Sequence, residues 1–256
     1  MRTATGVHVT VWGDGEPVVF VHGSFGWGEE TWREQRALAD HYRLLLVDRR
    51  GFGASPANGR VDFERDAEDV AALLDEGAHL VGHSYGGVVS LLAAAQRPDA
   101  VRSITLIEPP ALGIARGNPA VEELISNIEA AASDASDPAE YRMRFLRGFG
   151  FPAEPATLEG EELEAARASM TERPPWEAEI PLDRLADASL RVLLVQGDWC
   201  PAPDSARALA GEAFRAVCDV LDDRLDAERA VFPAAHSAHR LGRAFNDRLR
   251  RFWEAA

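Results

Sequence analysis

Short continuous runs of apolar residues recur along the chain, separated mostly by stretches with the spacing of amphipathic helices. Runs of about four to eight residues without polar alternation are typical of strands that are buried on both faces of a sheet. A weaker alternating run at 7–12 ends at Gly13-Asp14-Gly15, which predicts a hairpin-type turn. The segments predicted to form strands are 7–12, 17–21, 43–47, 79–81, 104–107, 191–196 and 229–232.

Helical patterns of ten or more residues lie between these strands, which indicates parallel strand–helix–strand units. They are predicted at 29–39, 62–74, directly after residue 86, at 204–225 and at 242–254. From 111 to 189 the alternation stops and the pattern is mostly helical. We therefore predict an α/β core of residues 1–110 and 190–256, with a mostly parallel doubly wound sheet, and a helical insertion of residues 111–189.

The composition limits the classes of partner. A chain of 256 residues with 46% hydrophobic content can bury a full core, and its net charge of −15 argues against binding nucleic acid or an anionic membrane. The two cysteines have no metal-ligand spacing, and no apolar run has the length of a signal peptide or a membrane span. We expect a cytoplasmic protein, a monomer or homodimer, that uses no metal or cofactor and acts on a small molecule.

The sequence Gly82-His83-Ser84-Tyr85-Gly86 follows a strand-like run and precedes a helix. This is G-x-S-x-G in the strand–turn–helix context of a nucleophile elbow. Glycines are needed because neighbouring chain passes close on both sides of so sharp a turn. The serine would stand exposed at a helix N-terminus, where backbone amides favour negative charge. Ser84 is therefore the candidate nucleophile.

A serine nucleophile needs a base, and seven histidines are available. His236 lies in a short loop after the last strand, so its side chain can reach the carboxyl ends of the strands. It is therefore the candidate base. His239 is expected to form a hydrogen bond nearby or to face solvent. The remaining histidines are placed at the opposite edge (His8, His41 and His79) or in tight loops that they brace (His22 and His83).

Two backbone amides are expected to hold the oxyanion that forms during acyl transfer. The first belongs to Tyr85, directly after the nucleophile. The second belongs to Ser24, because His22-Gly23 lets the chain turn after the strand at 17–21. The side chain of Ser24 is expected either to line the pocket or to cap the helix that begins near Glu29.

Taken in order, the segments HGSFG, DRRGFGAS, GHSYGG, IEPP, LLVQGD and AAHSAH resemble the α/β-hydrolase fold family. The resemblance covers the chain apart from the insertion, whose position is similar to that of the family's cap. It implies a serine hydrolase that cleaves small to medium, largely apolar esters, lactones or thioesters through an acyl-enzyme. It also leaves open a lyase, cyclase or acyltransferase with the same triad, and a ligand-binding protein of this fold with little turnover.

The triad acid is where the chain departs from the commoner family pattern. That pattern, G-x-x-D, would place the acid at residue 200, which is a cysteine expected to be buried or to line the site. Asp198 falls two residues early. Some members carry the acid at the end of the preceding strand, which corresponds here to Glu108. We therefore favour Glu108 and keep Asp198 as the alternative, with Asp48 and Asp204 as distant choices.

The cap is expected to determine specificity. Pocket residues are predicted to include Phe25, His83, Phe149 and Trp176. Leu124 and Ile128 have helical spacing and are expected mainly in the core of the cap. Arg142, Arg144 and Arg147 are expected to form a solvated helix face.

Overall fold

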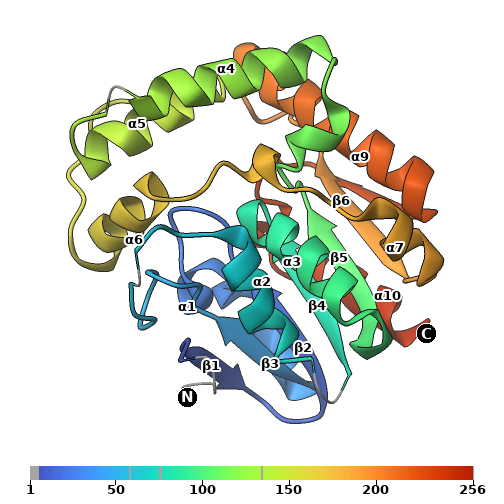
Figure 1. The fold of residues 1–256 in the computed structure, drawn as a ribbon. Coiled ribbons are helices and arrows are strands. Elements are labelled where there is room, and N and C mark those ends of the chain that lie inside the picture. Colours follow the sequence, from blue (N-terminus) through green and yellow to red (C-terminus); the bar gives the residue numbers. More distant parts are fainter. Residues whose placement is uncertain (1–5, 58, 75–76, 134, 256) are drawn as a thin grey trace.

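The computed structural model describes residues 6–57, 59–74, 77–133 and 135–255 (Figure 1). Its centre is a seven-stranded sheet in the order β1-β3-β2-β4-β5-β6-β7. All neighbouring strands are parallel except β1, which pairs with β3 in antiparallel fashion. The strands are β1 Val9–Trp12, β2 Glu16–Val21, β3 Tyr42–Val47, β4 Ala78–His83, β5 Val101–Ile107, β6 Val192–Gly197 and β7 Glu228–Phe232. The predicted α/β fold with a mostly parallel sheet is confirmed.

The hairpin-type turn predicted at Gly13-Asp14-Gly15 is wrong. β1 does not pair with β2; it lies against β3, with Val9 opposite Val47 and Trp12 opposite Leu44. The turn instead carries the chain past the loop before β3. A side-chain carbon added at Gly13 would lie 2.2 Å from the carbonyl oxygen of Ala39, so packing against this loop requires glycine there.

Helices cover both faces of the sheet (Figure 1). On one face, strand residues such as Val19, Leu80 and Leu106 pack in a single apolar cluster with α2, α3 and α9. On the other face, Phe20, Leu46 and their neighbours pack with α10 and with the 3-10 helix η1. The bounds are α2 Phe63–Ala71, α3 Tyr85–Gln96, α9 Glu212–Leu225, α10 Arg243–Glu254 and η1 Arg33–Asp40. This burial of both faces explains why the inner strands are largely apolar, whereas the edge strands β1 and β7 carry exposed and polar positions.

Two of the predicted helices are divided in the structure. The pattern at 29–39 forms the short helix α1, Gly28–Thr31, followed by η1. The pattern at 204–225 forms α8, Asp204–Ala206, then a π-helical turn η5, Arg207–Gly211, and then α9. The first break is at Trp32, whose ring packs against that of His239, and the second is beside Trp199, which a side-chain carbon added at Gly211 would approach to 3.0 Å.

The insertion lies between β5 and β6, and its longer helices stand over the carboxyl ends of the strands (Figure 1). Its last helix, α7, packs instead against α3 and α9 in the core layer. The other elements are η3 Leu112–Ala115, α4 Pro119–Ser133, α5 Pro138–Gly148, α6 Gly160–Met170 and η4 Pro175–Glu177, with α7 at Leu182–Asp187. In the described part of the chain, no helix combines the length and apolar character that crossing a bilayer requires.

Candidate active site

Ser84 stands between β4 and α3 in a strained backbone conformation, with φ of 51° and ψ of −127°. Its neighbours allow no side chain. A carbon added at Gly82 would lie 2.4 Å from Ser90 Oγ, and one added at Gly86 would lie 2.3 Å from the carbonyl oxygen of Val21. The amide of Ser84 donates to the carbonyl oxygen of Ile107 at 2.9 Å. The glycines thus let the turn approach β2 and α3 closely, as a nucleophile elbow requires.

Glu108, directly after β5, lies beside His236 in the loop after β7. Glu108 Oε2 lies 3.1 Å from His236 Nδ1, and the glutamate is 1% exposed. Its other oxygen, Oε1, accepts hydrogen bonds from the amide of Gly197 at 2.8 Å and from Trp199 Nε1 at 2.9 Å. Because a carboxylate only accepts, His236 donates from Nδ1 and keeps Nε2 available to take a proton. This is the orienting role that a triad acid performs.

Asp198, the alternative acid, has a local structural role. Its Oδ1 accepts the amide hydrogen of Cys200 at 2.9 Å, in the turn after β6. The expectation that Cys200 is buried or lines the site is wrong, since the residue is exposed. Asp48 accepts from the amides of Gly28 and Ala54 and so braces two loops. The exposed carboxylate of Asp204 pairs with a neighbouring arginine one turn further along.

Three further histidines are buried near the site. His22 Nε2 accepts the amide hydrogen of Arg49 at 3.1 Å, and His83 Nε2 donates to the carbonyl oxygen of His236 at 3.1 Å. The prediction for His239 is wrong: its ring is 1% exposed, and neither ring nitrogen has a hydrogen-bond partner among the described residues. The centroid of its ring lies 4.4 Å from that of His83 and 5.1 Å from that of Trp32. Burial lowers the pKa of all three, and lowers that of His239 to about 3. The neutral rings of His83 and His239 therefore support the loop that carries His236, and the neutral ring of His22 braces the loop after β2.

The loop after β2 carries the predicted second oxyanion donor. The carbonyl oxygen of Gly23 accepts from His22 Nδ1 at 2.7 Å and from Arg49 Nη2 at 3.1 Å. In a trans peptide the N–H points away from the C=O, so these bonds also fix the direction of the Ser24 amide. A side-chain carbon added at Gly23 would lie 2.8 Å from Ser84 Cβ, so this peptide runs directly beside the nucleophile.

Two cavities meet at Ser84, and both are also lined by Ser24, Phe145 and Phe149. One, of about 110 Å³, is walled mainly by apolar side chains of the cap and core: Leu112, Leu124, Ile128, Tyr141, Met170, Trp176 and Phe214. The other, of about 330 Å³, is lined by His236 and by polar groups that include Glu30, Arg142 and Arg240.

The four predicted pocket residues divide between these cavities. Phe25 and His83 line the cavity that contains His236, Trp176 lines the apolar one, and Phe149 lines both. Leu124 and Ile128 are buried, as expected of cap core, and also form part of the apolar wall. The expectation of a solvated arginine face needs correction at one position, because Arg142 lines a cavity.

Backbone strain is concentrated around the site. Six non-glycine residues of the described chain have positive φ, and four of them lie at the site: Phe25, Ser84, Glu108 and Trp199. Such conformations cost about 1–3 kcal/mol each and persist where surrounding contacts enforce them. The sequence did not predict positive φ at Phe25, Glu108 or Trp199, because these positions are not occupied by glycine or asparagine, the residues that usually adopt it.

Two further residues near the site were missed by the sequence analysis. Ser169 and Glu172, at the end of α6, contact the loop that carries Ser24 and Phe25. Their type and spacing are ordinary for an exposed helix end. The sequence would have pointed to them only if Arg49 had been recognised as a buried residue, because a buried guanidinium needs carboxylate partners.

The chain is similar to known proteins over most of its length. Residues 18–248 match the model of the alpha/beta hydrolase family. The chain is 31% identical over 242 residues to a pimeloyl-[acyl-carrier protein] methyl ester esterase of Aeromonas salmonicida, covering 90% of this chain and 89% of that protein. A protein of the same name from Aeromonas hydrophila is 39% identical over 104 residues, which span 40% of this chain and 41% of that protein. An alpha/beta hydrolase structure from Sphaerobacter thermophilus superposes with a TM-score of 0.67 at 23% identity, over 99% of both chains.

The chain therefore belongs to the alpha/beta hydrolase family, which confirms the resemblance drawn from its motifs. Within that family it is an enzyme of the carboxylic ester hydrolase class.

Proposed function

We propose that the protein hydrolyses small to medium, largely apolar carboxylic esters, thioesters or lactones through an acyl-enzyme on Ser84. The observation that carries this proposal is the contact of 3.1 Å between Glu108 and His236, at the same sheet edge as the strained elbow of Ser84. The order of motifs along the chain supports it independently, because nucleophile, acid and base each follow a different parallel strand.

In the proposed reaction, Glu108 and His236 lie on one side of Ser84 and move the proton, and the oxyanion donors lie on the other side. Ser84 Oγ attacks the acyl carbon while His236 Nε2 takes its proton, and Glu108 stabilises the resulting imidazolium. The amides of Ser24 and Tyr85 donate to the oxyanion of the tetrahedral intermediate. The bond between the acyl carbon and the leaving oxygen, or the leaving sulfur of a thioester, then breaks as His236 gives the proton to that atom. A water molecule, activated by the same histidine, attacks the acyl-enzyme and releases the acid.

The position of His236 supports one orientation of the substrate. The leaving group must lie near the base that protonates it, and His236 lines the more polar cavity. The acyl chain would then occupy the apolar cavity between Leu124, Ile128 and Trp176.

We propose that the substrate is a small molecule encountered in the cytoplasm, and that the enzyme acts there as a monomer or homodimer. Both cysteines are free in the structure, Cys200 at the surface and Cys218 in the core, which accords with a reducing compartment. The net charge of −15 disfavours nucleic acid and anionic membranes as partners.

Labelling with a fluorophosphonate tests the proposed nucleophile. The wild-type enzyme should be modified at Ser84, detected by mass spectrometry of the peptide, and should hydrolyse p-nitrophenyl acetate and butyrate. Ser84→Ala should remove the labelling and lower kcat by about 10⁴- to 10⁶-fold, as loss of a serine nucleophile does.

Ser205→Ala is the matched control, because this exposed serine on α8 lines neither cavity and donates to the carbonyl oxygen of Gly150. It should label and turn over as the wild type does. Labelling that persists in Ser84→Ala would show that another residue is the nucleophile and would refute the proposal.

A further inference from the structure

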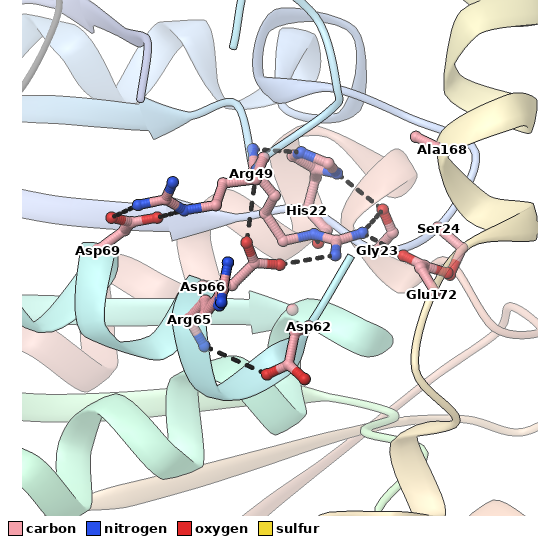
Figure 2. A network of polar contacts seen from close by, with 12 residues as sticks. His22, Gly23, Ser24, Arg49, Asp62, Arg65, Asp66, Asp69, Ala168 and Glu172 are labelled. Atoms are coloured by element: carbon pink, nitrogen blue, oxygen red, sulfur yellow. Dashed lines mark hydrogen bonds and ion pairs between the residues drawn. The ribbon is translucent and has the colours of Figure 1, made fainter. Parts of the chain in front are cut away.

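The end of the cap helix α6 reaches down to the loop that carries the proposed oxyanion donor (Figure 2). Glu172 Oε2 accepts a hydrogen bond of 2.5 Å from Ser24 Oγ. Ser169 Oγ accepts one of 2.9 Å from the amide of Phe25, whose φ is 61°. Two cap residues thus hold two consecutive residues of the loop, one through its side chain and one through its backbone.

A buried arginine connects the cap to the preceding peptide as well. Arg49 Nη2 donates both to Glu172 Oε1 at 2.6 Å and to the carbonyl oxygen of Gly23 at 3.1 Å, as Figure 2 shows. Arg49 Nε donates to the carbonyl oxygen of His22 at 3.0 Å. The nitrogen that binds the cap carboxylate is therefore the one that orients the Gly23–Ser24 peptide.

Because the side chains of Arg49 and Glu172 are both buried, their arrangement depends on the two charges neutralising each other. The side chain of Arg49 is fully buried and that of Glu172 is 8% exposed, so neither charge is compensated by water. Asp66, at 3.1 Å from Arg49 Nη1, is the second carboxylate on the guanidinium. Burial raises the pKa of Glu172, and the nearby charge of Arg49 opposes that rise. A buried guanidinium that loses one carboxylate must find another partner or admit water, and either change moves Nη2.

Glu172 also lies in the wall of the apolar cavity, beside Ser24, Ser84 and Tyr85. Its two oxygens, however, are both engaged by the loop and by Arg49. A carboxylate so occupied acts on the loop rather than on the substrate. Catalysis by an oxyanion hole depends on the direction of its donors, because they must meet the charge that develops in the transition state.

We propose that Glu172 and Ser169 are positioning residues through which the cap sets the direction of the Ser24 amide in the oxyanion hole. This inference rests on the proposed function, since it assigns the cap a role in transition-state stabilisation at Ser84. In this proposal the cap contributes to catalysis and also forms part of the pocket wall.

Kinetics on p-nitrophenyl butyrate, with binding of a trifluoromethyl ketone as a transition-state analogue, tests the proposal. Glu172→Ala should lower kcat by about 10- to 100-fold, with KM changed by less than about threefold, as misplacement of a catalytic group does. Affinity for the trifluoromethyl ketone should fall by the same factor as kcat/KM. Glu172→Gln keeps oxygen acceptance for Ser24 without the charge, so its loss should be smaller.

Ser169→Ala provides a variant that keeps the buried charges intact. It removes the acceptor for the Phe25 amide, together with a hydrogen bond from the same hydroxyl to the carbonyl oxygen of Ala165 within α6, and should lower kcat by about 3- to 10-fold. Ser24→Ala keeps the donating amide and removes the hydroxyl that Glu172 holds. Combining it with Glu172→Ala should cost less than the product of the two separate losses, because the two changes break the same bond. Glu164→Gln, on the exposed side of α6 and paired with Arg167, is the matched control and should behave as the wild type.

Unchanged kcat and unchanged trifluoromethyl ketone affinity in folded Glu172→Ala and Ser169→Ala would overturn the proposal. A rise in KM with kcat unchanged would also overturn it, because it would show that Glu172 contacts the bound substrate instead. A wild-type enzyme that does not hydrolyse esters would refute the proposed function, and this outcome is visible before any variant is made.

Discussion

Glu108 and Glu172 are both buried carboxylates that lie next to a proposed catalytic group, but they come from different parts of the chain. Glu108 follows a strand and is held by Gly197 and Trp199, at the end of the neighbouring strand. Glu172 follows a cap helix and binds an arginine and a serine from two loops of the core. The base side of the site is thus formed within the sheet domain, whereas the oxyanion side is completed by the insertion.

The two sides also differ in their chemistry. Apart from the carboxylate of Glu108, the buried neighbours of His236 are uncharged rings, including His83 and Phe214, and His239 packs in turn against His83. Around Ser24 they are charged groups that neutralise one another, Arg49 with Glu172 and Asp66. The base side should therefore be sensitive to acid, and the oxyanion side to the loss of a single charge.

The acid of the triad gives the largest expected difference. Glu108→Gln preserves the shape of the side chain but disfavours the histidine tautomer that leaves Nε2 free to accept a proton, so kcat should fall by about 10³- to 10⁴-fold. Asp198→Asn should lower kcat by less than about threefold, because the carboxylate of Asp198 accepts the amide of Cys200 and an amide oxygen can do the same. Steady-state kinetics of the two purified variants measures both. The opposite order of effects would move the acid to Asp198.

Removing the central charge of the oxyanion side should lower stability. Arg49→Met leaves Glu172 and Asp66 buried without their counter-ion, at an expected cost of about 3–5 kcal/mol in the free energy of unfolding. Burial already raises the pKa of Asp66 to about 6 with Arg49 in place. Urea denaturation at pH 7 measures the change.

The control for this change is Arg116→Met, which breaks an exposed pair with Glu122. It should alter the free energy of unfolding by no more than about 1 kcal/mol. Equal effects of the two substitutions would show that Arg49 does not hold a buried charge network.

The base side should respond to pH through His239. Its pKa is lowered by burial to about 3 in the folded protein and returns to about 6.5 on unfolding. The unfolded chain therefore binds the proton first, so the stabilisation is complete above about pH 6.5 and decreases as the pH falls toward 3. His239→Phe should reduce the slope of unfolding free energy against pH by about 1.4 kcal/mol per pH unit between pH 6 and 4.

Urea denaturation at several pH values gives these slopes. His41→Gln changes an exposed histidine and should leave the slope as in the wild type. A His239→Phe variant with the wild-type slope would mean that His239 is hydrated in the native protein.

Much of the core and of the base side could be predicted because its signals are local. Most of the central strands are largely continuous apolar runs, and Ser84, Glu108 and His236 each follow a strand within a few residues. Because the strands are parallel, their carboxyl ends lie at one edge of the sheet regardless of the conformation of the loops. The departures occurred where pairing is not local: β1 lies on β3, Cys200 is exposed, and His239 is buried.

The sequence by itself determined the fold class, the nucleophile elbow and the region from which base and acid must come. Hydrophobic periodicity and close-approach glycines act over a few residues and can be recognised without coordinates. Only the tertiary structure decided that Glu108 rather than Asp198 touches His236, and that Glu172 binds Arg49 across 123 residues of sequence. The first contact depends on how the loops after β5 and β7 meet at the edge of the sheet, and the second on how the insertion packs over the strand ends. No pattern within a single segment specifies either arrangement.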